Sequence, residues 1–282
     1  MSVITIEGVD VHVEGEGPET IVMMHGWPDT HRLWDAQVAA LKDRHRCVRF
    51  TQPGFDPDKP ARAPSLDELV RIYGAIIDHV SPGRPVTLLL HDWGCVFGLQ
   101  YAMRHPERVA RVAAIDIGDT NSQAFARSLS AKAKLGIAGY QLWLALAWKL
   151  GGTLGTAMTR KMARWLRCRS EPSVMTWQMN YPYWMAWTGG LKDSRRIEPA
   201  CPVLFMYGQR KLFMFHSPRW EERVRALPGG EVLGLPTGHW VMVQAPEAFN
   251  RALADWLDRT SPAPRTSAPP PPASPPRSEA LS

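Results

Sequence analysis

The sequence predicts an α/β fold: a mostly parallel sheet flanked by helices, with an inserted helical cap. Runs of apolar residues with strand character alternate with helical segments along most of the chain, as happens when helices join parallel strands. Residues 121–196 interrupt this alternation, because they contain several helical stretches and no convincing strand. We therefore expect a core of residues 1–120 and 197–259, a cap of residues 121–196, and a proline-rich tail of residues 260–282 without regular structure.

The expected strands and helices follow in chain order. Residues 3–13 alternate apolar and polar side chains around Gly8 and predict a hairpin. Further strands are expected at 20–24, 46–50, 86–90, 111–117, 202–207 and 231–235. Helices are expected at 34–41, from Leu66 to about Val80, after residue 92, at 218–227 and at 246–257. The helix from Leu66 is preceded by Ser65 with Glu68 three residues later, which is a capping box.

One short turn organises the predicted site. The buried run Val86–Leu90 leads into His91, Asp92, Trp93 and Gly94, after which the pattern becomes helical. A sharp strand-to-helix turn of this kind exposes a single side chain above the sheet, next to the N–H groups at the start of the helix. Here that side chain is the carboxylate of Asp92. The alternative interpretation is that Asp92 only caps the helix.

A carboxylate favours different chemistry from the more common serine at such a turn. It is ionised at neutral pH and can displace a leaving group from an sp³ carbon, which forms an alkyl ester of the protein. Water activated by a histidine can then hydrolyse that ester. Asp92 therefore indicates ring opening or displacement at carbon, and argues against an ordinary esterase.

Composition narrows the class of protein. The 282 residues are 45% hydrophobic and 21% charged, which is ordinary for a globular chain. The four cysteines lack a disulfide or metal-binding spacing, and no stretch resembles a signal peptide or is long enough to span a bilayer. We expect a cytoplasmic protein with no metal and no organic cofactor.

Four motifs together carry a family resemblance. They are His25-Gly26-Trp27-Pro28, Pro53-Gly54-Phe55, His91-Asp92-Trp93-Gly94 and Gly238-His239-Trp240. With these motifs, residues 3–259 resemble the α/β-hydrolase superfamily, in particular its epoxide hydrolases and haloalkane dehalogenases with aspartate nucleophiles. One departure is Leu90, where the family usually has a small residue.

The resemblance implies roles for three further residues. His239 follows the last predicted strand, where the family places its general base. The acid that orients this base usually follows the strand 202–207, but residues 208–211 contain no acid. In some haloalkane dehalogenases the acid follows the earlier strand instead, and Asp116 matches that position; Asp119 is the fallback.

The resemblance also distinguishes two reactions. The backbone N–H groups of Trp27 and Trp93 would form an oxyanion hole. An epoxide needs hydroxyl donors from the cap, for which Tyr140, Tyr181 and Tyr183 are candidates, although Tyr181 and Tyr183 could instead pack in a proline-containing turn. A halide needs N–H donors, and dehalogenases with the shifted acid typically carry asparagine in place of Trp27. We favour epoxide hydrolysis and keep haloalkane dehalogenation as the alternative.

The cap has two unusual features. It holds six of the twelve tryptophans, which favours an apolar pocket for a small lipophilic substrate and water. It also holds 12 Lys and Arg against 2 Asp and Glu, although the whole chain has a net charge of only +6. Basic residues crowd one stretch with Met158, Met162 and Trp165 at apolar spacing: Arg160, Lys161, Arg164, Arg167 and Arg169.

Two alternative functions belong to classes other than enzymes. The protein could associate weakly with an anionic membrane surface, or it could be a hydrolase fold that only binds a ligand. Nucleic-acid binding is not expected, because no recognised module accompanies the charge.

Overall fold

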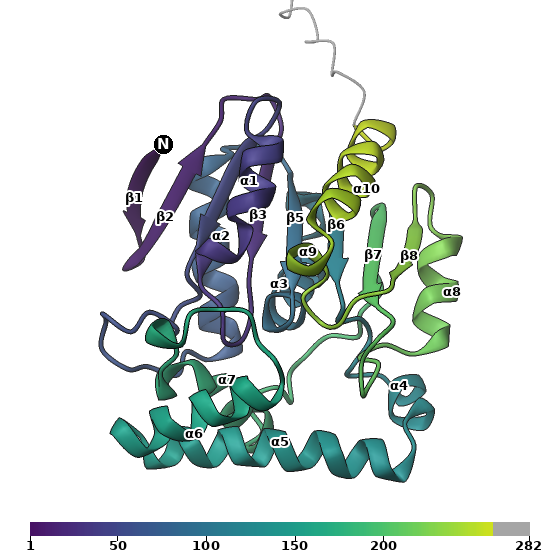
Figure 1. Ribbon diagram of the computed structural model, residues 1–282. Coiled ribbons are helices and arrows are strands. Elements are labelled where there is room, and N and C mark those ends of the chain that lie inside the picture. The colour runs from purple at the N-terminus through teal and green to yellow at the C-terminus, as the bar shows by residue number, and fades with distance from the viewer. Residues whose placement is uncertain (262–282) are drawn as a thin grey trace, which may run out of the picture.

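A computed structural model describes residues 1–261 (Figure 1). Eight strands form one sheet in the order β1-β2-β4-β3-β5-β6-β7-β8. β1 and β2 form an antiparallel hairpin, β2 is antiparallel to β4, and all other neighbours are parallel. The predicted fold class is therefore confirmed. The predicted proline-rich tail lies outside the described residues from 262 onward.

The strands lie close to their predicted positions. They are β1 (Ser2–Ile6), β2 (Val9–Glu14), β3 (Thr20–Met24), β4 (Arg46–Phe50), β5 (Val86–His91), β6 (Val109–Ile115), β7 (Val203–Gly208) and β8 (Glu231–Leu235). β3 and β5 are buried along their whole length, because both faces of the sheet are covered by helices.

The core helices cover the two faces of the sheet separately. α2 (Leu66–Val80), α3 (Trp93–Arg104) and α8 (Pro218–Ala226) pack in the cluster that contains Leu88 and Leu90 of β5. α1 (Asp35–Leu41), α9 (Val241–Gln244) and α10 (Pro246–Arg259) pack in the cluster that contains Leu89. Successive side chains of a strand point to opposite faces, so the central strands β3 to β7 contribute to both clusters. The Ser65 side chain accepts a hydrogen bond from the Glu68 N–H, as the capping box predicts.

The segment between β6 and β7 is helical. It contains α4 (Gln123–Ser128), α5 (Ala131–Leu150), α6 (Gly152–Trp165) and α7 (Tyr181–Trp187), with short 3-10 turns at Pro172–Val174 and Trp177–Asn180. These helices lie across the carboxyl ends of the central strands, and α5 forms the outer side of the molecule there (Figure 1). No helix among residues 1–261 is both long and apolar enough to cross a bilayer.

The buried face of α6 is formed by small residues. α6 buries the small residues Gly155, Thr159 and Ala163 against the rest of the cap. Met158 and Met162 are only half-buried, and Trp165 is 60% exposed. Close helix packing therefore selects the small side chains of α6 and leaves the larger apolar ones partly or largely exposed.

Candidate active site

Asp92 occupies the sharp turn between β5 and α3. Its backbone has φ 52° and ψ −124°, a strained conformation for a residue with a Cβ. The surroundings leave little space at this turn, since a Cβ on Gly26 would lie 2.3 Å from Asp92 Oδ1. A Cβ on Gly94 would lie 2.2 Å from the Met24 carbonyl oxygen. Both glycines are therefore required for the chain to approach the carboxylate and for α3 to pack on β3.

Gly98 accommodates the large residue that precedes the turn. Leu90 is fully buried, and a Cβ on Gly98 would lie 2.5 Å from Leu90 Cδ2. Gly98 thus makes room for a leucine where the family usually has a small residue. The sharp bend at Asp92 is retained.

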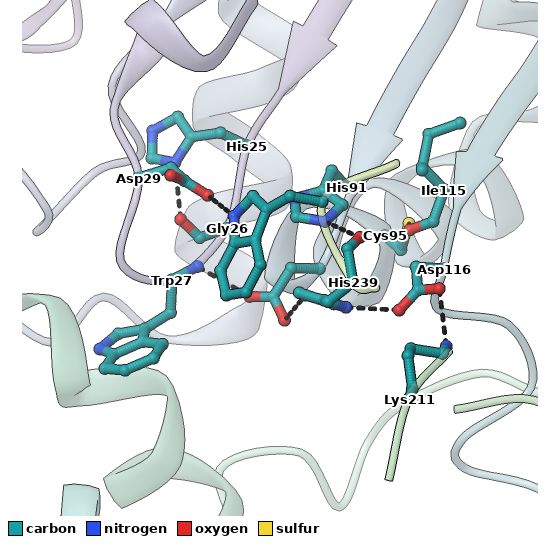
Figure 2. Close-up of polar contacts among 12 residues, drawn as sticks. His25, Gly26, Trp27, Asp29, His91, Cys95, Ile115, Asp116, Lys211 and His239 are labelled. Carbon is teal, nitrogen blue, oxygen red and sulfur yellow. Dashed lines mark hydrogen bonds and ion pairs between the residues drawn. The ribbon is translucent and has the colours of Figure 1, made fainter. Parts of the chain in front are cut away.

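The two oxygens of the Asp92 carboxylate have different partners, Trp27 and His239, both of which are labelled in Figure 2. Oδ1 accepts a hydrogen bond of 2.7 Å from the Trp27 N–H. Oδ2 lies 3.2 Å from His239 Nε2. Burial raises the pKa of Asp92, but hydrogen bonding and the charge of His239 outweigh it and hold the pKa below its usual range. The carboxylate is therefore ionised, with one oxygen held by the backbone and the other beside the histidine.

Asp116 orients His239 from the other side of the ring. His239 Nδ1 donates to Asp116 Oδ2, and Asp116 is completely buried at the end of β6. Burial raises the pKa of Asp116, but the charges of Lys211 and His239 lower it well below its usual range. Lys211 Nζ lies 2.6 Å from Asp116 Oδ1, which also accepts from the Gly208 N–H at 3.0 Å. The structure thus brings Asp92, His239 and Asp116 into one chain of contacts.

His239 is held as a cation in this arrangement. Burial lowers its pKa, but the charge of Asp116 and hydrogen bonds to Asp116 and Asp92 raise it to about 9. His91 Nε2 lies 3.2 Å from the His239 carbonyl oxygen, and burial lowers the pKa of His91 to about 3. The neutral His91 ring therefore donates to that carbonyl and fixes the loop that carries His239.

The fallback acid, Asp119, lies elsewhere. Its Oδ1 accepts from the Ser217 N–H at 2.8 Å, and its Oδ2 accepts from the hydroxyls of Ser217 and Ser122, each at 2.7 Å. These bonds tie the start of the cap to the N-terminus of α8. Asp119 forms no hydrogen bond or ion pair with His239, and its bonds to Ser217 and Ser122 give it a structural role.

Two of the three candidate tyrosines line the same cavity as Asp92 and His239. This cavity has a volume of about 790 Å³ and includes Trp27, Tyr140 and Tyr183 in its walls. The Tyr140 and Tyr183 rings are 6.0 Å apart and perpendicular, and Tyr183 packs edge-on against Trp93 at 5.2 Å. Burial raises the pKa of both hydroxyls, so both stay protonated.

The expectation for Tyr181 is corrected. Tyr181 does not line the cavity but is completely buried, with its ring 5.6 Å from Phe55 and 6.5 Å from Phe97. Its hydroxyl has no hydrogen-bond partner among the described residues. Tyr181 and Tyr183 both lie in α7. Residues two apart in a helix point in different directions, so only Tyr183 of this pair faces the site.

Sequence reasoning missed three residues that support this site. Lys211 balances the charge of Asp116 from the loop where the family usually carries the acid. Asn180 accepts from Trp27 Nε1 at 2.8 Å and donates to Thr159 at 2.7 Å, which joins the core to α6. Asp29 accepts from Trp240 Nε1 at 2.9 Å and from the Ser170 hydroxyl, and burial raises its pKa to about 6. Only Asp29 had a sequence signal, since it directly follows the His25–Pro28 motif.

The family is established by comparison with known proteins. The family model for the alpha/beta hydrolase fold matches residues 19–246, and the chain belongs to this family. A structure of an epoxide hydrolase from Bacillus megaterium superposes with a TM-score of 0.69 at 19% identity, covering 91% of this chain and 100% of that one. A thermophilic esterase from Thermogutta terrifontis superposes with a TM-score of 0.66 at 17% identity, covering 92% and 98%. At these identities the likeness shows the fold.

Curated relatives match over shorter segments. "Probable oxidoreductase EphD" of Mycobacterium tuberculosis is 40% identical over 113 residues, which is 38% of this chain and 19% of that protein. A "Cis-3-alkyl-4-alkyloxetan-2-one decarboxylase" of Xanthomonas campestris is 33% identical over 130 residues, 42% of each chain. A "Haloalkane dehalogenase" of Agrobacterium fabrum is 34% identical over 108 residues, 38% of this chain and 35% of that protein. The matches therefore span less than half of each of these relatives.

Proposed function

We propose that the protein hydrolyses epoxides to vicinal diols through an ester of Asp92. The observation that carries the proposal is the placement of the Asp92 carboxylate between the Trp27 N–H and His239, in a cavity that Tyr140 and Tyr183 also line. The carboxylate is the nucleophile, and the protonated tyrosines are the donors that an opening epoxide ring requires.

In the first step Asp92 Oδ2 attacks an epoxide carbon and the ring C–O bond breaks. Oδ2 is the attacking atom because Oδ1 is held by the Trp27 N–H. The alkoxide takes a proton from a tyrosine, and His239 supplies the replacement through water. His239 can release this proton because the ester removes the negative charge that lies 3.2 Å from its Nε2. The ion pair of Asp92 and His239 becomes a neutral ester beside a neutral histidine.

In the second step neutral His239 takes a proton from water, and the hydroxide attacks the ester carbon. The negative charge develops on Asp92 Oδ1, where the Trp27 and Trp93 N–H groups serve as the oxyanion hole. The intermediate expels the diol as its alkoxide, which takes a proton from His239, and the proton of the added hydroxyl passes to His239 as the Asp92 carboxylate forms again. Asp116 and Lys211 stay charged throughout, and the Asp92–His239 ion pair is restored.

A second candidate is haloalkane dehalogenation. It is favoured by the position of Asp116 after β6, which resembles that of the acid in some dehalogenases. A departing halide needs two N–H donors, however, and the Trp27 indole N–H is already bonded to Asn180. Of Trp27 and Trp93, only Trp93 therefore offers its indole N–H to a halide. This difference favours the epoxide.

Single-turnover analysis in H₂¹⁸O tests the proposal. With enzyme in excess over styrene oxide, we expect the first diol to carry ¹⁶O from Asp92 and the enzyme to gain ¹⁸O. The Asp92→Asn variant should form no diol above background. Bromoalkanes and a 3,4-dialkyl β-lactone serve as competing substrates, the latter because one relative is named for that ring. Halide release or lactone decarboxylation without any diol from epoxides would overturn the proposal.

A further inference from the structure

An exposed apolar strip runs along the outer side of α5. Its members are Leu135, Leu142, Leu146 and Leu150, each between 48% and 76% exposed. Intervals of seven and four residues place them on a single face of the helix. Leu154, in the first turn of α6, is 58% exposed and follows directly. In Figure 1, α5 spans the side of the molecule opposite the sheet.

The strip is not needed to hold α5 in place. The opposite face of the helix already buries Leu144, Ala145 and Ala147 against the cap and core. Because one apolar face of α5 is already buried, its second apolar face is available to contact another apolar surface.

The charges around the strip are almost all positive. Exposed Lys132 and Lys134 precede it, Lys149 lies within it, and Lys161 is exposed on α6. Lys149 and Lys161 lie over the rings of Trp184 and Trp143, each at 5.5 Å. None of these lysines forms an ion pair with another residue of the described part of the chain.

We propose that this outer face of the cap docks on an anionic phospholipid bilayer. The five leucines would enter the interface between headgroups and acyl chains, and the lysines would contact the phosphates, which is how amphipathic helices lie on membranes. This places the membrane contact on the leucines of α5 and on Leu154 at the start of α6, instead of on the basic stretch of α6. This inference concerns binding and is independent of the proposed reaction.

A second copy of the chain fits the strip less well. Contact between two α5 helices would bring lysines near lysines, because the cap has only Glu171 and Asp193 to pair with its 12 basic residues. A bilayer with anionic headgroups supplies the missing negative charge along the whole strip.

Vesicle co-sedimentation of the full chain tests the proposal. We expect binding to phosphatidylcholine vesicles with about 30% phosphatidylglycerol, and much weaker binding to phosphatidylcholine alone. Binding should fall steeply in about 1 M salt, where the Debye length is about 3 Å. The L142S/L146S variant should bind at least about tenfold more weakly, and K132A/K134A about fivefold or more.

Two controls separate the outcomes. Val3→Ser removes an aliphatic side chain of similar exposure from β1, far from the cap, and should bind like the wild type. Circular dichroism and light scattering report folding and oligomeric state for every variant. Equal binding to both vesicle types, or undiminished binding of L142S/L146S, would contradict the proposal. A wild-type dimer that L142S/L146S converts to a monomer, without vesicle binding by either, would assign the strip to self-association instead.

Discussion

Lys211 Nζ lies 2.6 Å from Asp116 Oδ1, while His239 donates to the other oxygen of the same carboxylate. Both the lysine and the acid are almost inaccessible to solvent, with side chains 5% and 0% exposed. If His239 were the only cation beside the buried Asp116 carboxylate, Asp116 would lose its counter-charge whenever His239 gives up its proton during catalysis. The second cation keeps Asp116 ionised whatever the state of His239.

Lys211→Met should therefore cost stability as well as activity. Removing one partner of a buried ion pair typically costs about 3 kcal/mol, whereas Lys211→Arg keeps the charge and should cost less. The low pKa of Asp116 contributes stability that is present above its unfolded value near 4 and is lost as pH falls through the folded pKa. Urea unfolding at pH 7 and at about pH 3 should thus show a smaller destabilisation by Lys211→Met at the lower pH, because the wild type has by then lost part of the contribution of the charged Asp116. An equal destabilisation at both pH values would mean that Lys211 does not support the charge of Asp116.

Asp116→Asn should reduce turnover by about 10³- to 10⁴-fold, because the amide can neither stabilise the histidine cation nor fix its tautomer. Asp119→Asn is the matched control: Asp119 is buried at the same end of the sheet but bonds to Ser217 and Ser122. It should lower stability and leave kcat nearly unchanged. The reverse ranking of the two variants in steady-state diol formation would transfer the acid role to Asp119.

The raised pKa of His239 has its own signature in stability against pH. Its contribution is complete below the ordinary value of 6.5 and is lost as pH rises through about 9. Asp116→Asn removes the largest favourable charge, so the free energy of unfolding should depend less on pH across this interval than in the wild type. Chemical denaturation at pH 6.5 and pH 9 measures the difference.

His239→Gln should stop the reaction after the first step. Without a base to activate water, the ester of Asp92 should accumulate to about one equivalent. Intact-protein mass spectrometry would then show a gain equal to the mass of the epoxide, and peptide mapping would place it at Asp92. The same variant with Asp92→Asn should show no gain. Normal diol turnover by His239→Gln would refute the role of this residue.

The three tyrosines provide a matched set of single-atom changes. Tyr140→Phe and Tyr183→Phe should each slow ester formation, and together by about 10²- to 10⁴-fold, because both residues line the cavity with Asp92. Tyr181→Phe should leave the rate unchanged, and it should not destabilise the fold because its buried hydroxyl has no partner in residues 1–261. Pre-steady-state measurement of ester formation distinguishes them.

Leu90 and Gly98 should behave as a coupled pair. Gly98→Ala places a Cβ 2.5 Å from Leu90 Cδ2 and should destabilise the fold by about 1–3 kcal/mol. In a Leu90→Ala background the same change should cost much less, because the obstructing atoms are gone. A double-mutant cycle of unfolding free energies measures the coupling. Additive effects would show that the two positions do not compensate each other.

The parts of the fold with a strong local pattern could be predicted from the sequence. The predicted ends of β3, β4 and β8 match the observed ones, and the turn residues around Asp92 predicted the start of α3. The short helix α9 was missed because four residues show no helical period.

Long-range contacts could not be predicted in the same way. Lys211 and Asp116 are 95 residues apart, and only the order of β6 and β7 in the sheet brings them together. Tyr181 and Tyr183 are equivalent in the sequence, yet the direction of α7 sends one into the core and the other into the cavity. Side-chain direction depends on how an element docks, which a one-dimensional pattern does not record.

The left-handed backbone at residue 92 is imposed by the neighbours, since Gly26 and Gly94 clear the space and β5 and α3 fix both ends. Backbone atoms alone already require both glycines, since a Cβ on Gly26 would lie 2.4 Å from the Trp93 nitrogen and one on Gly94 would lie 2.2 Å from the Met24 carbonyl oxygen, whichever side chain residue 92 carries. The scaffold therefore separates the shape of the turn from the chemistry presented on it. A family built this way can exchange carboxylate, hydroxyl or thiol at one codon and keep its architecture, so reaction type can diverge faster than structure.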